Sequence, residues 1–281
     1  MIRAYRRRKL VDQLARGACL VATLGALVPL FSVLVYVSAK GLGGLDWALF
    51  TELPRPVGEV GGGMANAFFG TLVLVALACA VGIPTGVLAG IYLAEFGGTG
   101  PLARAVRFSC DVLSGIPSIT VGIFVYTLVV VTMRRFSALA GGLALGLLML
   151  PMVTRTTEEL LRLVPDALRE GALALGVPKW RMIVSVVLRT AAPGVLTGVL
   201  LSVARIAGET APLLFTALNN QFWSTRLDRP IGSLTVQIYT YAVSPYEDWH
   251  RKAWAGALVL VASVLVLNLC ARIFIHTRGA R

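Results

Sequence analysis

The hydrophobic pattern of this 281-residue chain consists of long runs without charge, separated by short polar segments. A helix needs about 20 apolar residues to cross the hydrocarbon core of a bilayer. Six stretches approach that length, and the fifth is interrupted by two charged residues. The six are Gly17 to Ala39, Asn66 to Ala94, Val112 to Met133, Phe136 to Thr154, Thr190 to Leu218 and Ala253 to Ala271. The pattern predicts an all-α integral membrane protein with six transmembrane helices.

Composition agrees with this pattern, because 57% of the residues are hydrophobic and only 14% are charged. Soluble domains carry about 25% charged residues. The composition therefore excludes an ordinary soluble enzyme. The first apolar run follows a basic N-terminus, as a signal peptide does, but it is longer than the roughly 7 to 15 residues of a signal core. We interpret it as a retained helix.

The net charge of +12 is mainly a matter of topology. Of the 26 lysines and arginines, 17 lie in segments that six spans place on the same side as both termini, and 8 lie on the other side. Cytoplasmic loops are the basic ones, so both termini are predicted to be cytoplasmic. Arg134 and Arg135, in a short outer turn, are the local exception. The basic residues alternate with apolar runs and form no exposed basic face, so nucleic-acid binding is not expected.

Proline occurs in each of the first five predicted spans. Proline removes a backbone donor, which a membrane helix tolerates where protein or a water-filled cavity satisfies the freed carbonyl. Close helix packing explains each site alone, whereas five kinked helices together favour a transport bundle. Four polar residues near the prolines could line a path, although helix packing is the simpler interpretation; they are Asn66, Thr71, Ser114 and Ser118.

Motifs for catalysis and metal binding are missing from the sequence. No phosphate-binding loop with its Gly-Lys-Ser/Thr ending occurs, so any ATP must be bound by another chain. The only histidines, His250 and His276, lie at membrane edges, and four widely spaced cysteines lie in or beside apolar runs. We expect no catalytic residue, no metal site, no disulfide framework and no cofactor.

The most polar internal segment runs from Arg155 to Arg189. Pro165 followed by an acidic turn favours a helix start, Gly176 favours its end, and a second helix can begin at Pro178. The segment therefore predicts a helical hairpin beneath the membrane. Periodicity alone leaves two interpretations: an amphipathic hairpin at the lipid interface, anchored by Trp180, or a docking site for a cytoplasmic partner.

The same segment contains Glu170-Gly171-Ala172 and, after three further residues, Gly176. This spacing resembles the Glu-Ala-Ala-x-x-x-Gly signature of ABC importer permeases, whose loop inserts into a groove of the ATPase subunit. Gly171 replaces the first alanine of the signature, and Arg189 stands where many members have proline. The resemblance implies that these four residues form an ATPase-coupling loop.

Two charges fall inside the fifth predicted span, Arg205 and Glu209. An arginine within a membrane helix costs about 2.5 to 3.5 kcal/mol and normally faces protein or water. In a continuous helix Glu209 would lie one turn away on the same face. The pair either locks two helices together or offers a guanidinium to an oxyanion in transit, with Thr210 adding a hydroxyl. We predict that Arg205, Glu209 and Thr210 belong to a transport path.

The segment Arg205-Ile-Ala-Gly-Glu-Thr-Ala-Pro-Leu-Leu-Phe-Thr-Ala217, with Asn220-Gln-Phe-Trp-Ser-Thr225 after it, resembles the PstA-type permeases of bacterial phosphate ABC transporters. Pro178-Lys-Trp180 and Ala253-Trp-Ala-Gly256 match as well, and the likeness extends from about Asn66 to the end of the chain. It implies a type I importer permease with a MetI-like bundle in the bacterial inner membrane. It also implies phosphate as the transported ion and three kinds of partner: a homologous PstC-type permease, a PstB-type ATPase dimer and a PstS-type phosphate-binding protein.

These expectations divide the chain into three regions. Residues 1–65 hold the basic N-terminus, the first helix and an outer loop, residues 66–275 form the permease domain with the coupling loop 155–189, and residues 276–281 are a cytoplasmic tail. One alternative is a permease for another oxyanion such as sulfate or molybdate, against which the segment from Arg205 to Ala217 argues. A stand-alone secondary transporter or channel is the other, and the Glu170 to Gly176 loop argues against it.

Overall fold

The computed structural model describes residues 2–57 and 59–279, with side chains for residues 7–57 and 59–270. Within this part of the chain, all regular secondary structure is helical apart from one isolated bridge between Pro54 and Gly62. The long helices are α1 (Ile2–Leu42), α3 (Ala65–Glu95), α4 (Pro101–Gly115), α7 (Ala138–Arg162), α10 (Leu188–Ala207) and α13 (Glu247–Gly279). The short helices are α2 (Ala48–Thr51), α5 (Ser118–Val125), α6 (Val131–Met133), α8 (Asp166–Ala174), α9 (Lys179–Met182), α11 (Ala211–Thr216) and α12 (Leu234–Ala242), and two π-helical turns are η1 (Tyr126–Val130) and η2 (Ile183–Val187).

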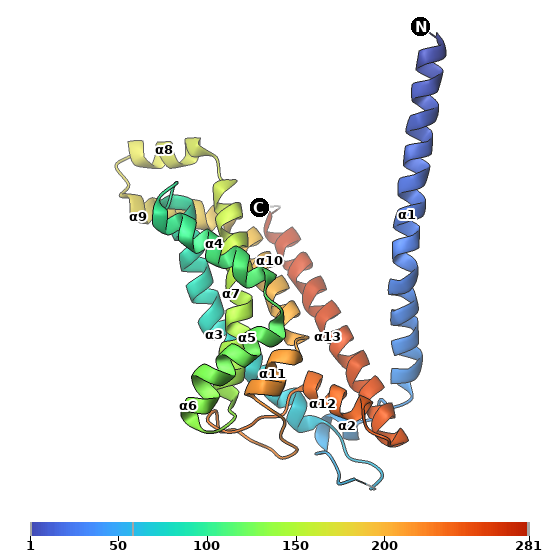
Figure 1. The fold of residues 1–281 in the computed structure, drawn as a ribbon. Coiled ribbons are helices and arrows are strands. Elements are labelled where there is room, and N and C mark those ends of the chain that lie inside the picture. Colours follow the sequence, from blue (N-terminus) through green and yellow to red (C-terminus); the bar gives the residue numbers. More distant parts are fainter. Residues whose placement is uncertain (1, 58, 280–281) are drawn as a thin grey trace.

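The number of membrane spans agrees with the sequence prediction. Five helical segments of the described chain are long and apolar enough to cross a membrane, and the count is six when the bent pair formed by α4 with α5, η1 and α6 is taken as one span. Helix α1 stands at the edge of the bundle and packs against α13 (Figure 1), where Tyr36 and Trp254 meet edge to face with ring centroids 5.1 Å apart. The all-α, multi-span class is confirmed.

Helices α3 and α7 form the tightly packed centre of the bundle. Small residues on one face of α3 allow the two backbones to approach closely. A Cβ atom added at Gly86 would lie 2.8 Å from Val153 Cβ, and one at Gly90 would lie 2.5 Å from Thr157 Cβ. Leu74 and Met149 are fully buried in the same core. The contact makes α3 and α7 a closely fitted pair that leaves little freedom for one to move without the other.

The predicted third span, one helix from Val112 to Met133, is wrong in its geometry. Helix α4 ends at Gly115, the chain bends by 107°, and α5 begins at Ser118. Ile116 is extended, with ψ at 134°, because the ring of Pro117 excludes helical backbone angles at the residue before it. The bend leaves an opening between the helices near the middle of the bundle.

The predicted fifth span, from Thr190 to Leu218, is also wrong at both ends. The helical segment already begins at Lys179 and runs through η2 into α10, and it ends at Ala207 with Gly208 as its C-cap. The chain then starts a separate short helix, α11. Arg205 therefore lies in the last turn of α10, and Glu209 lies beyond the helix.

The fourth and sixth spans extend further than their apolar cores. Helix α7 continues to Arg162, and α13 runs from Glu247 to Gly279. The polar segment outside the long helices is consequently shorter than the predicted loop 155–189 and spans residues 163–178. Within it, α8, a left-handed Gly176 with φ +79° and α9 confirm the predicted helix, glycine bend and second helix.

Both described chain ends lie on the side of the bundle that carries α8 (Figure 1). An even number of spans, such as the six predicted, requires both chain ends to lie on the same side of the membrane. Which side faces the cytoplasm stays a prediction from the distribution of basic residues. The predicted tail 276–281 falls partly within α13, and its residues 280–281 lie outside the described part of the chain.

Candidate functional site

A cavity of about 410 Å3 lies at the bend between α4 and α5. The middle of α7 and the end of α10 complete its wall. Its lining residues are Leu113, Ser114, Ile116, Pro117, Ser118, Leu148, Pro151, Met152, Arg155, Thr156, Arg205 and Glu209. Two arginines, one carboxylate and three hydroxyl groups thus meet in one space within the bundle, although they come from three separate stretches of sequence.

Arg155 is the functional candidate that sequence reasoning missed. The sequence placed it in a cytoplasmic loop, because the apolar run ends at Thr154, but α7 continues past it and Arg155 lines the cavity. Its guanidinium pairs with the carboxylate of Asp111 on α4 and lies 3.7 Å from Glu158 Oε2 on α7. About 32% of the side chain remains exposed. Arg155 is therefore held in place while part of its guanidinium stays accessible.

Arg205 and Glu209 both line the cavity, as the prediction of a shared site requires, but they do not share a helical face. Gly208 ends α10 between them, so the expected spacing of one helical turn does not apply. Among the side chains that the structure describes, neither residue has an ion-pair partner within 4 Å. Arg205 is exposed and Glu209 is half-buried. Within the described part of the chain, both residues line the cavity without an ion-pair partner, so their charges are available to a ligand.

Thr210, the third predicted path residue, is not part of the cavity wall. It occupies the N-cap position of α11, half-buried beside the break in the chain. Ser114 and Ser118, by contrast, do line the cavity, one on each side of the bend. The first turn of α5 carries Ser118, so its free backbone N–H groups add partial positive charge at this point of the wall.

Asn66 and Thr71, the other two polar residues near prolines, belong to a different part of the molecule. The Asn66 amide donates to the carbonyl oxygen of Asn220 at 2.5 Å, and the Thr71 hydroxyl accepts from the Leu234 N–H at 2.8 Å. These bonds hold the long segment after α11 against the start of α3. Their role in the structure is packing, which was the simpler interpretation of the sequence.

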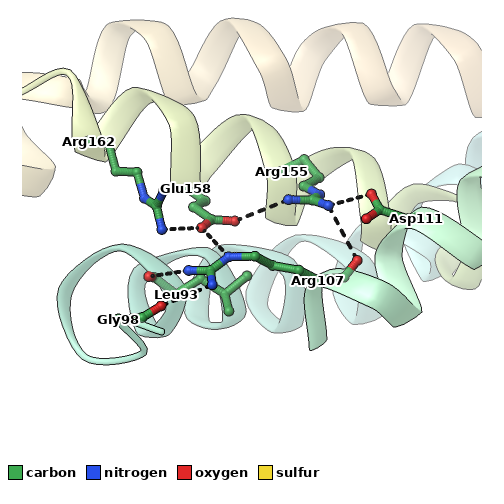
Figure 2. A network of polar contacts seen from close by, with 7 residues as sticks. All are labelled: Leu93, Gly98, Arg107, Asp111, Arg155, Glu158 and Arg162. Atoms are coloured by element: carbon green, nitrogen blue, oxygen red, sulfur yellow. Dashed lines mark hydrogen bonds and ion pairs between the residues drawn. The ribbon is translucent and has the colours of Figure 1, made fainter. Parts of the chain in front are cut away.

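A network of charged side chains adjoins the cavity through Arg155 (Figure 2). At its centre the carboxylate of Glu158, whose side chain is 4% exposed, accepts from Arg107 Nε at 2.8 Å and lies 2.7 Å from Arg162 Nη2. Arg107 also donates to the carbonyl oxygens of Leu93 at 3.2 Å and Gly98 at 3.0 Å. The network joins the ends of α3 and α7 to the middle of α4.

On the other side of the bend, α5 packs against α11. A Cβ atom added at Gly122 would lie 2.6 Å from Pro212 Cα, so only glycine permits this approach. The segment after α11 then returns to the start of α7, where the Ala138 N–H donates to the carbonyl oxygen of Arg229 at 3.0 Å. Together these contacts form a packed layer beyond the α5 side of the cavity, which we call the cover.

An ion-pair cluster fastens this cover at the surface. The Asp228 carboxylate accepts two bonds from Arg226, at 3.0 and 3.1 Å, and lies 3.2 Å from Arg135. The hydrogen bonds from Arg226 lower the pKa of the Asp228 carboxyl below its ordinary value. Arg135, the local exception to the charge distribution, thus has a partner on its own side.

The four predicted coupling residues all lie on α8 or directly after it. Glu170 and Gly171 are exposed on α8, Ala172 is half-buried against an apolar cluster around Val164, and Gly176 makes the bend. Four leucines on or beside this helix are also exposed: Leu163, Leu168, Leu173 and Leu175. An exposed apolar and acidic face on a short helix is typical of a protein docking site.

Comparison with known proteins places this architecture in a family. The family model described as "Binding-protein-dependent transport system inner membrane component" matches residues 86–277. The chain is 51% identical to the phosphate transport system permease protein PstA of Yersinia pestis, over 96% of this chain and 91% of that protein. It is 40% identical to PstA 1 of Mycobacterium tuberculosis H37Rv, over 98% of this chain and 91% of that protein.

Solved structures share the fold at low sequence identity. A bacterial ABC transporter involved in the import of the acidic polysaccharide alginate has a chain that superposes with a TM-score of 0.67 at 17% identity, covering 96% of this chain and 99% of that one. The MetNI methionine ABC transporter in an inward-facing conformation gives a TM-score of 0.60 at 18% identity, covering 76% and 96%. These neighbours show the fold alone.

Proposed function

The chain belongs to the family of binding-protein-dependent transport system inner membrane components, in its PstA branch, and we propose that it moves inorganic phosphate as the permease subunit of an ATP-driven importer. It is a multi-pass protein of the inner membrane. It is a transporter subunit, and it has the fold of ABC importer permeases. The observation that carries the proposal is the cavity in which Arg155 and Arg205 face the same space. Relatives named as phosphate permeases favour phosphate over sulfate or molybdate.

The cavity suits a hydrated or partly dehydrated phosphate ion. Guanidinium groups bind oxyanions through several charge-assisted hydrogen bonds, and the hydroxyls of Ser114 and Ser118 can add weaker ones. A transport site must attract its ion without holding it. Because Asp111 and Glu158 already bind Arg155, its guanidinium binds phosphate more weakly than an unpaired guanidinium would. The arrangement therefore supports passage in preference to tight binding.

Glu209 gives the cavity a way to distinguish protonated oxyanions. A carboxylate can only accept hydrogen bonds. Phosphate keeps at least one proton near neutral pH and can donate it to Glu209, whereas sulfate has none to donate and would be repelled. The Glu209 carboxylate, which has no ion pair among the described side chains, thus favours phosphate over sulfate even if the cavity fits both ions equally well.

The chain functions with an ABC system, since its family comprises the membrane components of importers that use separate binding proteins. We infer that a PstB-type ATPase dimer docks on α8, where Glu170 stands among exposed leucines. A homologous PstC-type permease would complete the path, and a PstS-type protein would deliver phosphate on the side of the α5–α11 cover. Closure of the ATPases would then move α8 and open the cavity toward the outside.

Uptake into proteoliposomes tests this function. The chain is reconstituted with its partner permease, ATPase and binding protein, and radiolabelled phosphate is counted inside the vesicles with and without ATP. We expect uptake only when ATP and the ATPase are both present, and no inhibition by an excess of sulfate or molybdate. Phosphate uptake by this chain alone, without any ATPase, would contradict an importer, and equal competition by sulfate would contradict phosphate as its substrate.

A further inference from the structure

A second buried ion pair, outside the cavity and its network, joins α8 to the end of α3. Arg169 Nη2 lies 2.9 Å from Glu95 Oε1, and the Arg169 Nε atom lies 3.3 Å from the same oxygen. The exposed fractions of the two side chains are only 16% and 5%. Glu95 is the last residue of α3, and Arg169 directly precedes Glu170 on the exposed helix.

Arg169 also holds the end of α7. Its Nη2 atom donates to the Leu161 carbonyl oxygen at 2.7 Å, and its Nη1 atom donates to the carbonyl oxygen of Val164 and to Asp166 Oδ1 at 3.1 Å. A single planar guanidinium thus binds the ends of two long helices and the start of α8 at once. Lysine could not reproduce this fork, because its donors radiate from one atom.

The second helix of the hairpin is tied to the same residue of α3. Lys179 Nζ at the start of α9 donates to the Glu95 carbonyl oxygen at 3.0 Å, and it lies 4.5 Å from the centre of the Phe96 ring. Both helices of the hairpin therefore contact Glu95, one through its side chain and one through its backbone. The end of α3 is the common anchor of the segment.

Attachment of the hairpin does not depend on this ion pair alone, although removing one partner would leave the other charge buried and unpaired. An apolar cluster of buried residues, including Val164, Met182 and Ile183, with the half-buried Ala172 packed against it, already holds the hairpin to the bundle. A buried ion pair contributes little to stability beyond what apolar residues of similar size would provide. The forked contact instead fixes the orientation of α8 relative to α3 and α7.

A short path through the backbone of α3 and a series of polar contacts leads from this pair to the cavity. Two residues before Glu95, the Leu93 carbonyl oxygen accepts from Arg107 at 3.2 Å. Arg107 binds Glu158, and Glu158 lies 3.7 Å from Arg155 in the cavity wall. Figure 2 shows the last part of this series, with Arg107 on α4 facing Glu158 and Arg155 on α7. A displacement at Glu95 has a short route to Arg155.

We propose that Arg169 is a positioning residue for transport: through Glu95 it converts displacement of α8 into movement of α3, α4 and α7, and so of Arg155. This inference rests on the proposed importer function, because it requires an ATPase that moves α8. It differs from docking, since Arg169 is buried in the permease and the docking face lies on exposed neighbours such as Glu170.

The test measures phosphate transported per ATP hydrolysed by the complete importer in proteoliposomes. The variants are Arg169→Met, Arg169→Lys, Glu95→Gln and the double change Arg169→Met with Glu95→Gln. Arg181→Ala is the matched control, because Arg181 is an exposed arginine of α9 with no ion pair among the described side chains. Co-purification of the ATPase and its hydrolysis rate are recorded for every variant.

We expect Arg169→Met to keep the ATPase bound and active while phosphate per ATP falls roughly tenfold, within the range by which mutations change coupling between sites. Arg169→Lys should lie between Arg169→Met and wild type, and the double variant should be no worse than Arg169→Met alone, because both changes break one contact. A wild-type ratio in Arg169→Met, or loss of the bound ATPase, would overturn the proposal. Absence of ATP-driven phosphate uptake by the wild-type complex would instead contradict the importer function itself.

Discussion

Removing the Glu158 carboxylate is the sharpest test of the polar network beside the cavity. In Glu158→Ala, the arginines 107, 155 and 162 lose the anion that they share. Their positive charges would then repel one another across a site where the central side chain is only 4% exposed. We expect α4 and the end of α7 to separate and the folded state to lose stability.

The magnitude follows from the exposure of each partner. Truncating one member of a buried ion pair costs about 3 to 5 kcal/mol. The Arg162 side chain is 52% exposed and Arg155 is 32% exposed, so water can replace most of what each of them loses. Arg107, at 20% exposure and 2.8 Å, carries most of the penalty. The low end of the range applies, and we predict a loss of about 3 kcal/mol.

Thermal unfolding of the detergent-solubilised protein measures this loss, and Glu159→Ala is the matched control. Glu159 lies next in α7 and is exposed, with no ion pair among the described side chains, so both variants change helix propensity equally. At about 2 to 4 °C per kcal/mol, Glu158→Ala should lower Tm by about 6 to 12 °C. Equal Tm values for the two alanine variants would refute the reasoning.

Three further predictions concern other parts of the molecule. Glu170→Lys should reduce the amount of ATPase that co-purifies, because it reverses an exposed charge on α8; an unchanged amount would contradict the docking role. Gly70→Ala should destabilise the fold by about 1 to 3 kcal/mol, since its Cβ would lie 1.9 Å from a backbone oxygen, whereas Gly25→Ala, with nothing within 4 Å, should not. The pKa of Asp228 is lowered in the folded state. Its ion pair therefore stabilises the fold fully above the ordinary carboxyl pKa of about 3.9, and this stabilisation is lost as pH falls through the pKa of the folded state. Hydrogen exchange of residues 226–229, corrected for intrinsic rates, should accelerate on acidification in wild type and show no such transition in Asp228→Asn.

Hydropathy predicted the span count well and the helix ends poorly. The apolar run that ends at Thr154 marks the limit of the hydrocarbon core, but α7 continues to Arg162 because Glu158 and its arginines bond to one another and to α4. Nothing in a window of local sequence shows that Arg107, far away in the chain, supplies a partner. Arg155 was therefore assigned to a loop. The spacing of Arg155, Glu158 and Arg162 on one helical face was the signal that could have revealed it.

The prolines as a group indicated a bundle of irregular helices, but no single proline indicated whether its own helix would bend. Pro84, Pro151 and Pro193 lie inside continuous helices, whereas Pro117 separates α4 from α5 by a bend of 107°. The difference comes from the surroundings, since a neighbouring helix or polar group can satisfy the freed carbonyl, and sequence alone does not show which neighbours are present. The bend at Pro117 is nevertheless what opens the cavity.

Of the three residues predicted for the transport path, two line the cavity, and their role in transport stays a prediction. Arg205 and Glu209 both reach the cavity, but the helical spacing that paired them does not exist, because Gly208 ends α10. Glycine in a membrane helix is common enough that its presence gave no reason to expect a break. Its charge inside an apolar span identified Arg205 as a candidate, and only the fold brought Arg155 into the same cavity.

ATP-driven phosphate uptake by Arg205→Ala and Arg155→Ala importers tests the central claim most directly. Each variant is compared with wild type and with Arg181→Ala in proteoliposomes, after the assembled complex has been checked by co-purification. Because both arginines line one cavity, we expect each alanine variant to assemble normally and to lose at least about 90% of uptake, a change of roughly 1.4 kcal/mol or more. Uptake at the wild-type rate in either variant would show that its arginine only packs, and in both it would contradict the cavity as the phosphate path.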